Sequence, residues 1–201
     1  MTRLVDEVLA LARSRPPTLG AGRLVAIDGP AGSGKSTLAT AISAQSGAPV
    51  IRLDDLYDGW TGLPLLDDQL TTLFRPLAHA EPGVYRRYDW HAGDYAETVA
   101  VEPTGLLVVE GVGAGSRSIA DLVTVLVWLD APVAVRRERA LARDGETFAP
   151  HWDAWAATEA EHYAVEGTAS RADVTDWAST GPRPGLDWAR PAAVIRGCRA
   201  P

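Results

Sequence analysis

The segment Gly29–Ser36 constrains the fold of this chain more than any other. Its sequence, Gly-Pro-Ala-Gly-Ser-Gly-Lys-Ser, has the spacing GxxxxGK[ST]. It follows an apolar run at 23–28 and precedes a helical pattern at 35–45. Glycines let backbone N–H groups converge on a phosphate, and a helix N-terminus adds positive charge. The order of strand, loop and helix therefore predicts a phosphate-binding loop, a Walker A motif, for ATP or a similar nucleoside triphosphate.

The predicted nucleotide-binding residues are Gly29, Pro30, Ala31, Gly32, Ser33, Gly34, Lys35, Ser36 and Thr37. In this motif the lysine, Lys35, contacts the β- and γ-phosphates, and the Ser36 hydroxyl binds Mg²⁺. We therefore expect ATP and Mg²⁺ as cofactors.

The chain has 19 lysine and arginine residues, and Lys35 is the only lysine among them. This bias indicates that the position requires an ammonium rather than a guanidinium. GTPases that recognise guanine need a further lysine in an Asn-Lys-x-Asp motif, so that class is excluded. A mechanical ATPase usually has Asp-Glu after the third strand, whereas this chain has Glu110-Gly111. A small-molecule kinase remains the best interpretation.

Composition narrows the range of partners. The formal net charge of −7 argues against a broad nucleic-acid surface, which needs clustered cations. The single cysteine, Cys198, excludes an intramolecular disulfide. No apolar run is long enough to span a membrane, and Asp6 and Glu7 interrupt the N-terminal apolar pattern of a signal peptide. We expect a cytoplasmic protein with a small-molecule acceptor and without nucleic-acid or membrane partners. A homo-oligomer is left open.

Strand and helix patterns alternate along the chain. Short apolar runs predict strands at 23–28, 50–55, 106–110, 122–130 and 172–175. Helical spacing predicts helices at 3–14, 35–45, 65–78, 132–143 and 149–165. This alternation predicts an α/β fold, a three-layer sandwich with a mostly parallel five-stranded sheet, of the P-loop NTPase type found in nucleoside and nucleotide kinases. Residues 54–104 are the least regular part.

We expect one domain over residues 1–201. Its parts are an N-terminal helix at 1–17, a core at 23–175, a lid region at 136–150 and a loose tail at 178–201. The acids Asp28, Asp54, Asp55, Glu110 and Asp130 fall at predicted strand ends, where ligands of parallel sheets bind.

Several motifs resemble one family in their order along the chain. Residues 26–37 resemble the P-loop of uridine kinases, phosphoribulokinases and cytidylate kinases. The segment 53–57, Leu-Asp-Asp-Leu-Tyr, is similar to the Asp-x-Phe-Tyr element of the uridine kinase and nicotinamide riboside kinase group. Further matches are Tyr88-Asp89-Trp90, Glu110-Gly111 and Arg139-x-x-x-Arg143-Asp144. The resemblance covers about residues 23–175.

The resemblance implies catalytic roles. Asp54 is the expected general base, because we expect it to end the strand beside the P-loop strand, and Asp55 is the second candidate. Ser36, Asp54 and Glu110 are the expected Mg²⁺ ligands. The alternative for Asp54 is a solvated turn or a helix cap, and for Glu110 an ordinary strand-end residue.

The helix at 132–143 carries four arginines. Arg136, Arg139 and Arg143 share one face by their spacing. The resemblance makes this segment a lid, with Arg139 and Arg143 as catalytic residues that steady the transferred phosphoryl group. The alternative is a solvated helix face. Asp144 is followed by Gly-Glu-Thr-Phe where uridine kinases have Arg-Gly, so the lid is expected to differ in shape.

The stretch 85–91 mixes aromatic, basic and acidic residues, and the corresponding family segment contacts the nucleoside. The predicted acceptor-binding residues are Tyr57, Arg87, Tyr88, Asp89 and Trp90. The alternative is a surface hairpin with ordinary ion pairs. Late in the chain, Trp152, Trp155 and Tyr163 are expected to pack in the core rather than bind a ligand.

The sequence therefore predicts an ATP-dependent kinase that phosphorylates a hydroxyl of a nucleoside such as uridine or of a nucleoside-like molecule. One alternative is a nucleoside monophosphate kinase, in which Arg75, Arg86 or Arg87 binds the acceptor phosphate. Another is a nucleotide-binding regulatory protein with little turnover.

Overall fold

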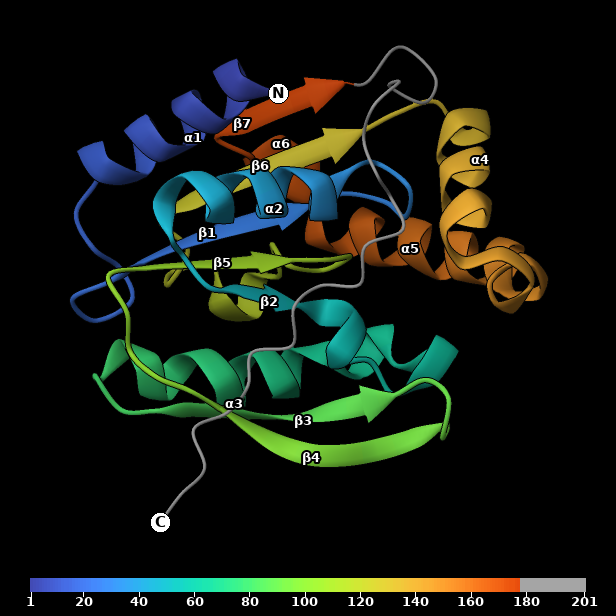
Figure 1. The fold of residues 1–201 in the computed structure, drawn as a ribbon, viewed down its shortest axis with the longest axis horizontal. Coiled ribbons are helices and arrows are strands. Elements are labelled where there is room, and N and C mark those ends of the chain that lie inside the picture. The colour runs from blue at the N-terminus through green and yellow to red at the C-terminus, as the bar shows by residue number, and fades with distance from the viewer. Residues whose placement is uncertain (178–201) are drawn as a thin grey trace.

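A five-stranded parallel sheet forms the centre of the computed structural model, which describes residues 1–177 (Figure 1). The strand order is β2-β5-β1-β6-β7, and every neighbouring pair is parallel. The strands are β1 Arg23–Asp28, β2 Val50–Arg52, β5 Leu106–Glu110, β6 Val125–Asp130 and β7 Val174–Trp177. The predicted sheet is confirmed, and its near-continuous apolar strands reflect burial on both faces. The predicted tail at 178–201 lies outside the described residues.

The order of the strands corrects one expectation. β5, which ends in Glu110, lies between β1 and β2 and pairs with both. The strand that precedes Asp54 is therefore not adjacent to the P-loop strand. It also ends earlier than predicted, because Leu53–Asp55 form a 3₁₀ turn in which Leu56 N–H and Tyr57 N–H donate to Leu53 O.

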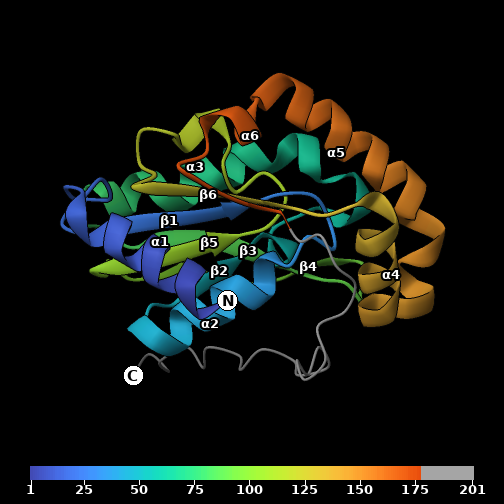
Figure 2. The same cartoon turned by 90° about the horizontal axis from the view of Figure 1, so that it is seen from above.

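Helices cover both faces of the sheet, as Figure 2 shows. On one face, α1 Thr2–Ser14 and α2 Lys35–Ser46 bury an apolar cluster that includes Val8, Leu9, Leu38 and Ile42. On the other face lie α3 Leu66–Ala78, α5 Trp152–Glu166 and the short α6 Thr168–Arg171. α4 Val133–Asp144 follows β6 at one end of the sheet. This arrangement is the predicted three-layer sandwich.

The irregular region of the sequence contains an antiparallel hairpin, which the sequence suggested only as the alternative for residues 85–91. Its strands are β3 Gly83–Asp89 and β4 Asp94–Val101, and it lies along α3 (Figure 1). Most of its residues are only partly buried or exposed, so it lacks the apolar runs of the central strands. Gly83 is needed where β3 meets α3, because a Cβ there would lie 1.9 Å from Leu73 O.

Other boundaries also differ from the predicted ones, and β7 covers Val174–Trp177 rather than 172–175. The fourth strand of the sheet begins at Val125 rather than residue 122, because Leu122 N–H closes a turn with Ile119 O. α5 begins at Trp152 after a 3₁₀ turn, Ala149–His151. Among residues 1–177, no helix combines the length and the apolarity needed to cross a membrane.

Candidate active site

The glycine-rich loop connects β1 to α2, as predicted. Gly34 precedes α2 with φ of +107°, a left-handed conformation that favours glycine. Lys35 is the first residue of the helix and is 8% exposed. Its Nζ donates to Gly29 O at 2.7 Å and Pro30 O at 3.0 Å. The lysine ammonium and the first N–H groups of α2 therefore lie on one loop, which is the arrangement that binds phosphates.

Glu110 brings the P-loop and the Asp54 turn together. It is 4% exposed at the end of the central β5 strand, where it lies in register with Ile27 of β1 and Arg52 of β2. Burial and the nearby charge of Asp54 raise the pKa of the Glu110 carboxyl, while Lys35 and Arg52 act in the opposite direction. An Arg52 guanidinium nitrogen lies 3.9 Å from a Glu110 oxygen.

These oxygens suit Mg²⁺. Within residues 1–177 no group of three or more histidine, cysteine or acidic side chains is placed to hold a metal alone. Mg²⁺ instead needs only one or two carboxylates, completed by phosphate and water oxygens. The buried carboxylate of Glu110, with the Ser36 hydroxyl and the Asp54 charge close enough to shift its pKa, supplies that partial set. The predicted ligands Ser36, Asp54 and Glu110 thus fit the ion.

Asp54 and Asp55 share the 3₁₀ turn after β2, with Asp54 exposed and Asp55 partly buried. Burial and the adjacent Asp54 charge raise the pKa of the Asp55 carboxyl, and Arg52 opposes them. The exposed carboxylate of Asp54 is therefore the one that an acceptor could reach from solvent.

Arg143 lies at the end of α4 and pairs with Asp144, Nη2 to Oδ2 at 2.6 Å. Desolvation lowers the pKa of its guanidinium, but the bond to Asp144 and the charges of Asp54 and Glu110 outweigh it and raise the pKa overall. Arg139 is partly buried one turn earlier on the same helix. The predicted lid arginine Arg143 is thus close enough to Asp54 and Glu110 for their charges to act on its guanidinium.

Arg136 has a different position from the one predicted for a lid face. Its Nε donates to Ala131 O at 3.0 Å and lies 3.3 Å from Asp130 Oδ1. Its Nη1 lies 3.9 Å from Glu159 Oε2 and donates to Ala31 O at 3.4 Å. Arg136 therefore contacts the P-loop rather than facing solvent.

A buried carboxylate at the end of β1 organises the other side of the site. Asp28 accepts the N–H groups of Gly29, Gly113 and Gly115, and the Tyr163 hydroxyl, at 2.7 to 3.0 Å. Burial raises the pKa of Asp28, and these hydrogen bonds oppose it. The second glycine-rich stretch after β5 thus binds an internal carboxylate and is fixed beside the P-loop.

Trp90, in the turn of the hairpin, bonds directly to the Asp54 turn. Trp90 Nε1–H donates to the Asp54 carbonyl at 2.8 Å. Tyr88 is 8% exposed and packs edge-on against Trp90. Arg87 instead forms two hydrogen bonds with Glu97, at 2.8 and 3.0 Å, and lies 3.7 Å from Asp89. These are the ion pairs expected of the alternative, a surface hairpin.

Two further predicted acceptor residues have internal contacts. Asp89 Oδ1 accepts the N–H groups of His91 and Ala92, closing the hairpin turn. Tyr57 is 1% exposed, and its hydroxyl donates to Val112 O at 2.8 Å. In this structure Tyr57 supports the wall of the site, and its hydroxyl has a partner in the protein. As expected, Trp152 and Trp155 are buried in the core and Tyr163 packs against it.

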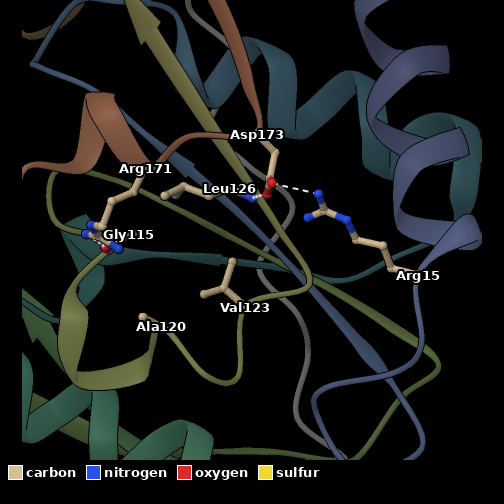
Figure 3. Close-up of a pocket in the computed structure, with 7 residues that line it drawn as sticks. All are labelled: Arg15, Gly115, Ala120, Val123, Leu126, Arg171 and Asp173. Carbon is tan, nitrogen blue, oxygen red and sulfur yellow. Dashed lines mark hydrogen bonds and ion pairs between the residues drawn. The ribbon is translucent and has the colours of Figure 1, made fainter.

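One cavity adjoins this region, and another lies away from it. One, of about 350 Å³, is lined by Trp60, Thr61, Pro64, His151, Ala154, Trp155 and Thr158. Trp60 stacks on Phe148 and His151 and contacts Trp90, so this cavity adjoins the hairpin aromatics. Figure 3 shows the other, of about 200 Å³, where Arg15 points to Asp173. It lies near the amino ends of β6 and β7, whereas the P-loop follows the carboxyl end of β1.

Sequence reasoning missed Glu159 and the role of Asp28. Glu159 interrupts an α5 pattern with little amphipathic character, so its burial has no periodic signal. Asp28 was recognised only as one of several strand-end acids. Its buried position directly before the P-loop could have indicated an internal partner.

Two solved structures share this fold. A protein described as a possible uridine kinase from Bacillus stearothermophilus has a TM-score of 0.56 and 22% identity, over 86% of this chain and 98% of that one. A protein whose description reads "putative fructose transport system kinase", from Silicibacter sp. TM1040, has a TM-score of 0.55 and 24% identity, over 87% of this chain and 97% of that one. No protein-family model and no curated protein matches the chain. The resemblance inferred from the sequence is thus confirmed at the level of the P-loop kinase fold.

Proposed function

We propose that this protein is a kinase that transfers the γ-phosphoryl group of ATP to a hydroxyl of a small molecule. The observation that carries the proposal is the position of Glu110, which ends β5 in register with Ile27 of the P-loop strand and with Arg52, two residues before Asp54. This position supports a site in which the P-loop, the proposed Mg²⁺ ligands and the candidate base lie close together. The acceptor that the sequence favours is a nucleoside such as uridine or a nucleoside-like molecule.

The residues act mainly by position and charge. Lys35 and the α2 N-terminus bind the phosphates, and Ser36, Glu110 and Asp54 would hold a Mg²⁺ ion, which would supply charge neutralisation of the phosphates. Asp54 accepts the proton of the acceptor hydroxyl. Arg143 and Arg139 on α4 stabilise the charge of the transferred group. Trp90 fixes the Asp54 backbone at the side where the hairpin borders the site.

The nucleoside monophosphate kinase alternative receives less support. It needs an arginine for the acceptor phosphate, but Arg75 already binds Asp121 through two hydrogen bonds and Arg87 binds Glu97 through two. Arg86 lies over the ring of Tyr95 at 4.4 Å.

The function is tested with D54N and a panel of nucleosides, nucleoside-like vitamins and sugars, measuring ADP release that depends on the acceptor. D54N is expected to lose about 10²- to 10⁴-fold in turnover, since it cannot accept a proton. It should keep most of its Mg·ATP affinity, because Lys35, the α2 N-terminus, Ser36 and Glu110 remain. D68N, at an exposed site on α3, is the matched control and should behave like the wild type. If no acceptor stimulates ADP release, the kinase proposal is refuted. If D54N abolishes the stimulated release, the alternative of a regulatory protein with little turnover is refuted.

A further inference from the structure

A buried carboxylate touches the loop that is proposed to bind phosphate. Glu159 on α5 is 3% exposed, and its Oε1 accepts the Ala31 N–H and the Trp155 Nε1–H, both at 2.7 Å. A buried negative charge beside a phosphate site opposes the binding of an anion. Attraction between charges therefore does not explain why an acid lies beside a site for ATP. The contacts of Glu159 must provide the explanation.

Those contacts hold one residue of the P-loop from two sides. The Ala31 N–H donates to Glu159, and the Ala31 carbonyl accepts from Arg136 Nη1 at 3.4 Å. Arg136 and Glu159 approach to 3.9 Å, with their side chains 12% and 4% exposed. The ion pair thus neutralises the buried acid and fixes the peptide groups on both sides of Ala31.

The next residue brings the backbone of α4 against the same loop. A Cβ at Gly32 would lie 2.2 Å from Arg136 O, so the loop and the helix are in direct contact there. Arg136 therefore contacts the P-loop through both its side chain and its backbone. Because Arg139 and Arg143 follow on α4, the position of the lid helix is tied to that of the loop.

We propose that Glu159 and Arg136 are positioning residues that hold the P-loop in its phosphate-binding conformation and link it to α4. The inference rests on the proposed nucleotide binding. It predicts that removing the acid weakens ATP binding, although a purely electrostatic role predicts tighter binding once a negative charge is removed. This difference in sign separates the two roles.

The test is the affinity for Mg·ATP by isothermal titration calorimetry, with circular dichroism to establish that each variant is folded. E159L is expected to bind about tenfold more weakly, because the Ala31 N–H loses a charged acceptor. E159Q keeps a carbonyl acceptor for the same N–H groups and should recover most of the affinity. The matched control is E161L, at an exposed position on α5.

R136Q supplies the second arm. It removes the Arg136 charge beside the buried Glu159 and leaves only that of Lys35, so it should lose more affinity than E159L, and E159Q/R136Q should bind more tightly than R136Q alone. Hydrogen exchange in the nucleotide-free protein gives a readout independent of ATP. The amide of Ala31 is expected to exchange faster in E159L and R136Q than in E161L.

Three outcomes decide between the proposals. In the first outcome, the wild type binds nucleotide and K35A does not, but E159L has the affinity and the exchange rate of the wild type. This outcome overturns the positioning role and leaves the proposed function standing. Tighter binding by E159L also overturns the positioning role, in favour of simple electrostatics. If the wild type binds neither Mg·ATP nor Mg·ADP, the proposed function fails, and the assigned purpose of the ion pair fails with it.

Discussion

Replacing Gly32 by alanine tests the contact between the P-loop and α4. The new Cβ would lie 2.2 Å from the Arg136 carbonyl oxygen and 2.7 Å from its carbon, with φ at +78°. Both neighbours are backbone atoms, so no rotamer change relieves the overlap. Normal van der Waals separation requires the loop and α4 to move apart by about 1 Å.

Gly47→Ala is the matched control. Gly47 has φ of +75°, but nothing lies within 4 Å of its Cβ position. Both variants should therefore lose about 1–2 kcal/mol of unfolding free energy through left-handed strain. Only G32A carries the additional steric cost, about 1–3 kcal/mol for overpacking. Urea denaturation measures this difference in stability.

Activity should separate the two variants more strongly. A 1 Å displacement of catalytic groups is enough to reduce turnover about 100-fold, so G32A should lose acceptor-stimulated ADP release on that scale. G47A, at the far end of α2, should keep wild-type turnover. Equal stability and equal turnover in the two variants would refute the packing argument, because the clash at Arg136 would then have no consequence.

Two further substitutions address the site's buried polar groups. Because burial raises the pKa of Glu110, the folded protein binds its proton more tightly than the unfolded chain, and wild-type stability should fall as pH rises above the ordinary value of 4.5. In Mg²⁺-free buffer E110Q should therefore be more stable than the wild type at pH 7, with the advantage vanishing below pH 4.5 in urea melts; an advantage independent of pH would contradict this. Y57F leaves the buried Val112 carbonyl without its donor and should cost about 1–3 kcal/mol in the same assay, with KM for the acceptor unchanged; a raised KM would instead support the acceptor contact predicted from the sequence.

The sequence allowed the sheet and the P-loop to be predicted because their signals are local. An apolar run of five or six residues defines each central strand, and the spacing around Lys35 defines the loop. Strand order is not local. Nothing in the run that precedes Asp54 indicates that β5 pairs between β1 and β2, so the expected adjacency was wrong. Glu110, rather than Asp54, is consequently the acid at the end of the strand next to β1.

The acceptor side was harder to predict for a related reason. Residues 85–91 contain side chains suited to ligand binding, but the same side chains can satisfy each other across a hairpin. Arg87 pairs with Glu97 on the opposite strand, and Asp89 caps the turn. These partners become visible only when the register of β3 and β4 is known. Composition could therefore predict a polar-aromatic segment but not which of its residues keep free polar groups.

The limits of sequence reasoning are clearest at the P-loop itself. GxxxxGK[ST] accounts for the groups that face a phosphate, whereas the outer side of the loop depends on contacts more than 100 residues away. Glu159 holds the Ala31 N–H across 128 positions, and Arg136 the Ala31 carbonyl across 105. The motif thus supplies the groups that bind phosphate, and contacts from helices α4 and α5 hold the loop in the conformation that binds it. A P-loop kinase that conserved the motif but lost these outer contacts should still bind phosphate, with lower affinity.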